Sequence, residues 1–234
     1  MIPATMRLHG YGPDQYEAVE QPTKADIERI RTQYPQLWLE CTGRPDDDLL
    51  IYLESAFKLH RLALEDCFTG HHRARAEEYS EHAFVLCRMP ERLNGERTLD
   101  QLSLFLNHTS LITFQLIPQD CLEGIRSRLQ NREPKLLGRG PDFLAYLIID
   151  TLIQSYFPVI ESIGDDLEEI EDIILERPSP KSMQHVHATR RDLLRLRRNA
   201  WPHREAVLFL TREDGQLVQP ETRIHLRDTS SHVA

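Results

Sequence analysis

Four carboxylates are the residues of this chain best suited to chemistry, and the chemistry they suit is the binding of a hard cation. Glu65 and Asp66 are adjacent and follow an apolar run. Asp150 interrupts the apolar segment 143–160, and Asp228 lies close to the C-terminus. Hard cations such as Mg²⁺ prefer oxygen ligands and keep several of their waters, so a few carboxylates can be enough to hold one.

Asp150 raises the sharpest question, because its neighbours in the sequence are almost all apolar. A buried, unpaired charge is costly, so Asp150 must be protonated, hydrogen-bonded, exposed on a narrow stripe or bound to a cation. The other carboxylates also have structural explanations, as a pair at a helix end or as a cap. The spacing of the four residues leaves open whether they converge on one site.

Other kinds of site have weaker support in the sequence. The chain contains no glycine-rich phosphate loop, no G-x-S-x-G and no H-E-x-x-H. The pairs His71–His72 and His185/His187 have different spacings and are more typical of surface histidines than of a metal centre. We therefore expect no nucleotide site and no histidine-based metal site.

A metal-dependent hydrolase is one alternative for the carboxylates. Glu65, Asp66 and Asp150 could surround one or two metal ions that activate a water molecule. Such an enzyme also needs a nucleophile or a proton acceptor, and the sequence places no His or Lys beside these acids. We therefore expect that the chain is not an enzyme.

Composition limits the class of protein. The chain has 234 residues and a formal charge of −9, which argues against a nucleic-acid-binding protein because such proteins usually carry a basic surplus. The acidic excess is compatible with metal cations. The four cysteines lie far apart and form no C-x-x-C pair, which favours reduced thiols in a cytosolic domain over disulfides or a zinc site.

The chain as given is expected to be soluble. Its N-terminus lacks the apolar region of a signal peptide. Segment 143–160 is long enough to span a membrane, but it contains Asp150, Gln154 and Pro158 and runs into an acidic segment. This pattern favours a helix that is half buried in a soluble core.

The first half of the chain mixes short strands and helices. Thr23 is the expected N-cap of a helix that ends near Tyr34, and the run Asp46–Asp48 is expected to begin another. Further helices are predicted over 61–68 and 119–131, strands over 37–42 and 83–89, and a hairpin over 99–106 and 111–117. Interleaved strands and helices predict a sheet that is covered by helices on both faces.

The second half is predicted to be all helical. After the helix that contains Asp150, segment 161–176 carries eight acidic residues and no basic one, whereas segment 184–201 carries five arginines. With the turn Arg-Pro-Ser-Pro at 177–180 between them, they predict a helical hairpin with complementary charges. Pro202 is expected to kink or restart the second helix.

The charged hairpin has more than one interpretation. Two solvated faces would attract each other weakly, by about 0.2–1 kcal/mol for each exposed pair. The hairpin could also be a charged projection near a membrane or an ion path, or an interaction module in its own right. In the last case the substitutions Arg195→Glu and Arg198→Glu would abolish assembly and metal would have no effect.

Five stretches of the chain match a known pattern, in the right order. They are LHRLALEDCFTGHHRARAEEY, LSLFLNHTSLITFQ, DFLAYLIIDTLIQSYFPVIESIGDDLEEIEDIILERP, RRDLLRLRRNAWPHREAV and ETRIHLRDTSSH. From about Trp38 to His232 the chain resembles the cytoplasmic domain of the CorA family of magnesium and cobalt transporters.

The resemblance implies an α/β fold and a place in a larger assembly. The implied fold is a three-layer α/β/α sandwich with a mixed central sheet over residues 1–140, a helical region with the charged hairpin over 141–220, and the start of a stalk helix over 221–234. The family is homopentameric, and its two membrane helices would follow Ala234. The chain is then expected to be the truncated cytoplasmic domain of an inner-membrane protein, without a nucleic-acid partner.

The resemblance also implies roles for the four carboxylates. Asp66 and Asp228 match the family's regulatory Mg²⁺ site between subunits, and Glu65 and Asp150 match residues of a neighbouring cation site. Loss of Mg²⁺ from these sites would loosen the ring of acidic subunits and open the pore.

The chain departs from the family pattern in a few places. Arg61 and Ala74 stand where the family has Pro, and Thr229, Ser230 and Ser231 replace Val, Tyr and Asp. Ion selectivity is set in the family's pore, which lies outside this sequence, so a zinc transporter of the ZntB branch is the alternative. The presence of all four carboxylates favours magnesium.

Overall fold

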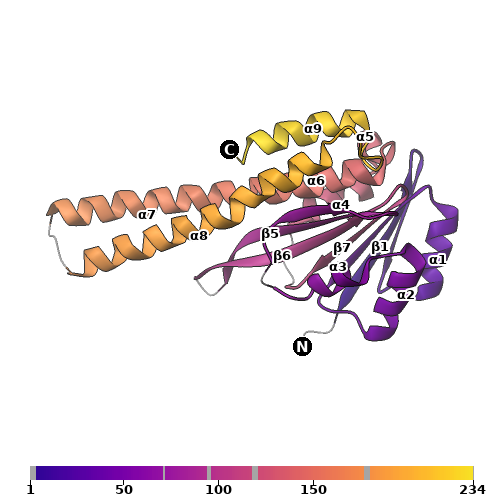
Figure 1. Ribbon diagram of the computed structural model, residues 1–234, viewed down its shortest axis with the longest axis horizontal. Helices are drawn as coiled ribbons and strands as arrows, with labels where there is room; N and C mark the ends of the chain where they lie inside the picture. Colours follow the sequence, from indigo (N-terminus) through magenta and orange to yellow (C-terminus); the bar gives the residue numbers. More distant parts are fainter. Residues whose placement is uncertain (1–3, 71, 94–95, 118–120, 177–179, 234) are drawn as a thin grey trace.

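A mixed sheet forms the centre of the molecule (Figure 1). The computed structural model describes residues 4–233 except 71, 94–95, 118–120 and 177–179. Within these residues the strands form one seven-stranded sheet in the order β2-β1-β3-β7-β6-β5-β4. The strands are β1 Thr5–Gly12, β2 Gln15–Glu20, β3 Gln36–Thr42, β4 Arg75–Glu78, β5 Ala83–Leu93, β6 Glu96–Leu106 and β7 Ser110–Gln115. Neighbouring strands are antiparallel except β3 and β7, which run parallel.

Helices cover both faces of this sheet (Figure 1). One face carries α1 Lys24–Gln33, α2 Asp47–Phe57 and α3 Arg61–Asp66. The other face carries α4 Glu123–Gln130, α5 Pro134–Leu137 and α6 Pro141–Gln154, followed by α7 Tyr156–Glu176, α8 Pro180–Leu210 and α9 Pro220–Ser231. The predicted three-layer α/β/α fold with a mixed sheet is therefore confirmed.

The strands supply both cores because successive side chains point to opposite faces. In β3, Leu37 and Leu39 belong to the core under α1, α2 and α3, whereas Trp38 belongs to the core under α6. All three side chains are almost completely buried. The run of apolar residues in β3 thus reflects a central strand covered on both sides.

Local signals account for the helix starts that the sequence predicted. Thr23 caps α1, and Asp26 completes a capping box with the Thr23 backbone N–H. Asp46 caps α2 by accepting a hydrogen bond of 2.8 Å from the backbone N–H of Leu49. The predicted helix at 61–68 and the predicted hairpin of β6 and β7 are also present.

Strands β1, β2 and β4 were not predicted, and Gly10 shows one reason. Glycine usually weakens a strand, but here a Cβ atom on Gly10 would lie 2.6 Å from the Tyr34 ring and 2.8 Å from Ile30. Gly10 therefore lets α1 approach β1 closely. Strand β2 is polar and half-exposed at the edge of the sheet, so it gives little apolar signal.

The helical half differs from the prediction in where its helices break. The apolar helix α6 ends at Gln154, and α7 begins at Tyr156. The acidic segment 161–176 therefore shares one helix with the last apolar residues of segment 143–160. Helix α8 continues through Pro202 as one element. Of the two outcomes expected of Pro202, the restart therefore does not occur, and the kink stays a prediction. The predicted turn at 177–180 falls largely on residues outside those described.

Burial of α6 in the core accounts for much of the apolar character of the segment that has the length of a membrane span. The stretch Pro141–Leu175 is long and apolar enough to cross a membrane, and 44% of its most apolar window is buried inside the protein. The buried residues Leu144, Ile148 and Leu152 belong to the same core as strands β5 and β6. That core also includes residues of α8 and α9, and the domain divisions at 140 and 220 stay predictions.

Candidate functional site

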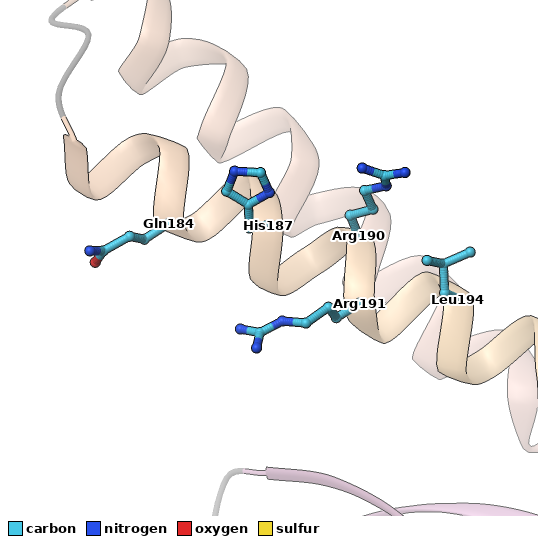
Figure 2. A pocket seen from close by; sticks show the side chains of 5 residues that line it. All are labelled: Gln184, His187, Arg190, Arg191 and Leu194. Atoms are coloured by element: carbon cyan, nitrogen blue, oxygen red, sulfur yellow. The ribbon is translucent and has the colours of Figure 1, made fainter.

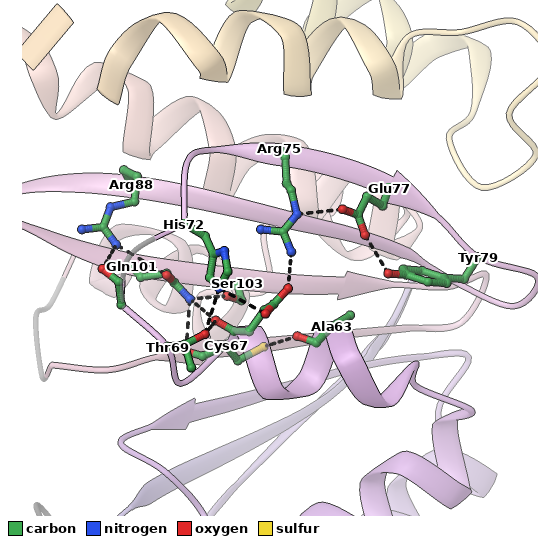
Figure 3. A network of polar contacts seen from close by, with 12 residues as sticks. Ala63, Cys67, Thr69, His72, Arg75, Glu77, Tyr79, Arg88, Gln101 and Ser103 are labelled. Carbon is green, nitrogen blue, oxygen red and sulfur yellow. Dashed lines mark hydrogen bonds and ion pairs between the residues drawn. The ribbon is translucent and has the colours of Figure 1, made fainter. Parts of the chain in front are cut away.

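Asp66 lies at the C-terminal end of α3. Its side chain contacts Arg75 and His72, which are labelled in Figure 3. Its Oδ2 atom accepts a short hydrogen bond from Nη2 of Arg75, and its Oδ1 atom lies 3.1 Å from Nε2 of His72. The Asp66 side chain is 28% exposed. His72, which the sequence placed among surface histidines, therefore contacts a candidate ligand, whereas His71 lies outside the described residues.

Arg75 is shared between two carboxylates. Its Nε atom lies 2.7 Å from Oε1 of Glu77, and the Tyr79 hydroxyl donates to the other oxygen of Glu77 at 2.6 Å. Burial would raise the pKa of Glu77, but the hydrogen bonds from Tyr79 and Arg75 outweigh burial and lower it. Burial and the hydrogen bond to Glu77 together raise the pKa of Tyr79 to about 12. Glu77 is thus a stable anion beside Arg75.

The backbone around Asp66 is fixed from the sheet by Gln101 of β6 (Figure 3). The Gln101 amide donates to the carbonyl oxygens of Asp66 at 2.8 Å and of Cys67 at 3.1 Å. The Gln101 side-chain oxygen in turn accepts from Arg88 of β5 at 3.4 Å, and Arg88 also donates to the carbonyl of Gly70 at 3.1 Å. The position of Asp66 is therefore tied to β5 and β6.

Arg88 is also the point where α7 and α8 are attached to the sheet. The Tyr156 hydroxyl of α7 donates to the Arg88 carbonyl at 2.7 Å, and the Arg88 backbone N–H donates to Nε2 of His203 in α8 at 2.9 Å. His203 is 1% exposed, and burial lowers its pKa to about 4. The neutral ring must carry its proton on Nδ1, which lies 3.2 Å from the Ala200 carbonyl. Sequence analysis missed this attachment.

Asp150 and Asp228 lie on the other side of the sheet, on α6 and α9, which pack against each other. The two oxygens of half-buried Asp150 accept hydrogen bonds from Thr229 at 2.8 Å and from Gln154 at 2.7 Å. Burial and then the charges of Asp150 and Asp228 raise the pKa of Tyr146. Of the explanations open for Asp150, hydrogen bonding is the one this chain provides by itself.

Glu65 is exposed and forms an ion pair of 3.2 Å with Arg61 on the same helix. It lines an open groove of about 680 Å³ between α2 and α3, together with Arg44, Glu54 and Phe68. Its carboxylate is free to exchange partners, because surface ion pairs are worth about 1 kcal/mol or less.

The four carboxylates therefore form two pairs. Glu65 and Asp66 lie on the face of the sheet covered by α3, and Asp150 and Asp228 lie on the opposite face (Figure 1). Across residues 4–233, apart from the gaps, no group of three or more His, Cys, Asp or Glu side chains is arranged to hold a metal ion. Within one chain, Asp150 does not join Glu65 and Asp66 as the hydrolase alternative requires.

The surface of α8 carries a separate basic patch (Figure 2). Gln184, His187, Arg190, Arg191 and Leu194 line a shallow hollow of about 500 Å³, and their side chains project from the helix. His187 is exposed, as predicted.

Comparison with known proteins gives the family of this fold. The profile of the family described as CorA-like Mg²⁺ transporter protein matches residues 36–234. The Cobalt/magnesium transport protein CorA of Thermotoga maritima is 29% identical over 229 residues, which are 97% of this chain and 65% of that relative. The chain thus spans less than two thirds of that relative's length.

Solved structures of low sequence identity share the fold. The soluble domain of CorA from Methanocaldococcus jannaschii superposes with a TM-score of 0.79 at 18% identity, covering 100% of this chain and 88% of that structure. The ZntB cytoplasmic domain from Vibrio parahaemolyticus gives a TM-score of 0.73 at 17% identity, covering 99% and 90%. With the family profile covering most of its length, the chain belongs to the CorA-like Mg²⁺ transporter protein family.

Proposed function

We propose that this chain is the cytoplasmic regulatory part of a homopentameric, CorA-type channel for Mg²⁺ and Co²⁺ in the inner membrane. The observation that carries the proposal is the placement of two carboxylate pairs on opposite faces of a family member. Asp66 cannot reach Asp228 of its own chain across the sheet, but the two can meet where neighbouring copies of the chain adjoin.

The residues fit a partly hydrated cation of this kind. Between neighbouring copies, Asp66 with Asp228 and Glu65 with Asp150 would each offer two carboxylates, and hard cations that keep several waters need only a few such ligands. Glu65 and Asp228 are exposed, so they can contact a neighbouring subunit. Bound Mg²⁺ would neutralise the charges that these acids bring to the subunit boundary.

The proposed gating compares a closed and an open arrangement of the subunits. In a closed ring Asp66 and Asp228 of adjacent subunits are held close, and they repel each other when no cation lies between them. An open arrangement separates them. Mg²⁺ favours the closed ring because it binds that state more tightly, and the ring relaxes when cytosolic Mg²⁺ falls.

Limited proteolysis of the complete gene product across a Mg²⁺ titration tests this proposal. We expect Mg²⁺ to protect the protein, and we expect Asp66→Asn and Asp228→Asn to raise the protecting concentration by about tenfold each, which is about 1.4 kcal/mol. Asp14→Asn is the matched control, because Asp14 is exposed in the turn between β1 and β2. Unchanged protection in both site variants would show that the regulatory sites lie elsewhere.

A ZntB-like zinc transporter is the second candidate, and the similarity to the ZntB cytoplasmic fold supports it. The same titration with Zn²⁺ separates the two candidates. Zn²⁺ would favour the zinc transporter if it protects the protein at a much lower concentration than Mg²⁺ does, and if Asp66→Asn does not change that concentration.

A further inference from the structure

We infer that Arg75 is an internal counter-ion for Asp66, so that a divalent cation at Asp66 competes with the Arg75 guanidinium and displaces it toward Glu77. The inference rests on the proposed regulatory role of Asp66 and adds a residue that sets the cation affinity of that site.

The contacts of Asp66 show why a cation must compete. Both carboxylate oxygens are engaged, one by Arg75 and the other by His72. These contacts leave lone pairs of the carboxylate open, so the competition is one of charge more than of space. The positive charge of Arg75 already compensates Asp66 and would repel a cation bound to the same carboxylate. Binding of a divalent cation at Asp66 therefore favours movement of the guanidinium away from it.

The surroundings of Arg75 offer its guanidinium partners other than Asp66. Glu77 already contacts its Nε atom at 2.7 Å, and the Tyr79 hydroxyl keeps the Glu77 carboxylate oriented. The Phe84 ring lies 5.4 Å from the guanidinium carbon, a distance that allows a cation–π contact. When Arg75 leaves Asp66 it thus keeps one carboxylate and one aromatic partner.

The burial of this cluster makes the competition effective. The Asp66 and Arg75 side chains are 28% and 27% exposed, so solvent screens their attraction less than that of a surface pair. Arg75 would therefore weaken the binding of the cation, and the site would respond only to an abundant ion. Glu77 limits this effect, because it draws Arg75 away from Asp66.

The test is a Mg²⁺ titration of the complete gene product, followed by limited proteolysis, for Arg75→Gln and Glu77→Gln. We expect Arg75→Gln to lower the midpoint of protection by about tenfold, since it removes the competitor. We expect Glu77→Gln to raise the midpoint, since Arg75 then stays on Asp66. Arg73→Gln is the matched control: it makes the same change of charge at an exposed position two residues away, and we expect a shift below about twofold.

Opposite shifts distinguish competition from damage to β4, because a merely structural defect would move both midpoints in one direction. An unchanged or raised midpoint in Arg75→Gln overturns the inference if Asp66→Asn still impairs the Mg²⁺ response. If Asp66→Asn leaves the response intact, the proposed function itself fails. The double variant Asp66→Asn/Arg75→Gln should respond like Asp66→Asn alone, and a further gain from Arg75→Gln there would also overturn the inference.

Discussion

At the scale of single residues, Glu40 is a charged side chain in the middle of the sheet. It is 9% exposed and contacts Nε2 of His9 and Nη1 of Arg126, each at 2.8 Å. These partners come from β1 and α4, on either side of Glu40 in the sequence. The ion pair therefore joins a helix to two strands, and Arg126 depends on Glu40 for a buried negative partner.

Glu40→Ala is expected to lower the free energy of unfolding by roughly 1–3 kcal/mol, because it removes the buried carboxylate that contacts both His9 and Arg126, and Arg126 keeps the more exposed Glu123 as a partner. Urea denaturation of the purified chain measures this loss. Glu20→Ala is the control, since the Glu20 side chain is 65% exposed in its pair with Arg7. A loss for Glu40→Ala no larger than that for Glu20→Ala would contradict the interpretation.

The local environment of the site was only partly predictable at this scale. The sequence identified Asp66 and Asp150 as unusual, because acids beside apolar runs are rare in cores. It could not identify Arg75 as the partner of Asp66 or Thr229 as the partner of Asp150. Those contacts depend on which strand and which helix lie next to each acid, and residue spacing does not contain that information.

At the scale of elements, one histidine of α8 links that helix to β5. His203 accepts a hydrogen bond from the Arg88 backbone and packs against the Tyr156 ring. Its acceptor role requires an unprotonated Nε2 atom. This hydrogen bond between α8 and β5 therefore depends on a neutral His203.

This dependence predicts a pH effect on stability. The pKa of folded His203 is about 4, below the ordinary value of 6.5, so the unfolded chain binds more protons between these values and stability falls as the pH falls through that window. In His203→Gln, the decrease in the free energy of unfolding on acidification should be smaller by up to about 3 kcal/mol. Chemical denaturation at pH 7 and pH 4.5 measures the difference.

The control for this experiment is His187→Gln, at an exposed position on the same helix, which should keep the wild-type pH dependence. His82 is also buried, with a pKa lowered to about 4 by burial, so some acid sensitivity should persist in His203→Gln. Identical pH dependence in His203→Gln and the wild type would exclude His203 as its cause.

Elements with their own local signals were the predictable part of the fold. Thr23 and Asp46 marked the starts of α1 and α2, because capping is encoded within a few residues. Strands β1 and β4 and the continuation of α8 through Pro202 were missed. For β1, a contact between distant segments outweighs local preference, because α1 packs directly against Gly10.

At the scale of the whole molecule, α7 and α8 extend beyond the sheet as a pair (Figure 1). In the middle of this pair Ile163, Ile170 and Thr189 are buried, whereas most of the charged side chains of α8 are exposed. Segments with few buried contacts open locally at lower free energy than a core. The projecting part is therefore expected to be the least stable part of the chain.

Limited trypsin digestion is expected to cut first in α8, at the exposed arginines Arg190, Arg191, Arg195, Arg197 and Arg198. The sheet and its covering helices should persist as large fragments, which mass spectrometry of the early products can identify. Substitution of the five arginines by Gln should slow this first cut. Initial cleavage within α1 or α4 would show that the sheet region opens before the hairpin.

The attachment at Arg88 has a mechanical consequence. The part of α8 from Pro180 to His203 is about 35 Å long at the helical rise of about 1.5 Å per residue. It is held at one end by the residue whose side chain also supports the Asp66 backbone through Gln101. A rotation of about 10° at this pivot would carry the far tip through about 6 Å, given that length. A small change in the direction of α8 at this attachment is therefore amplified along the hairpin and is largest at its tip.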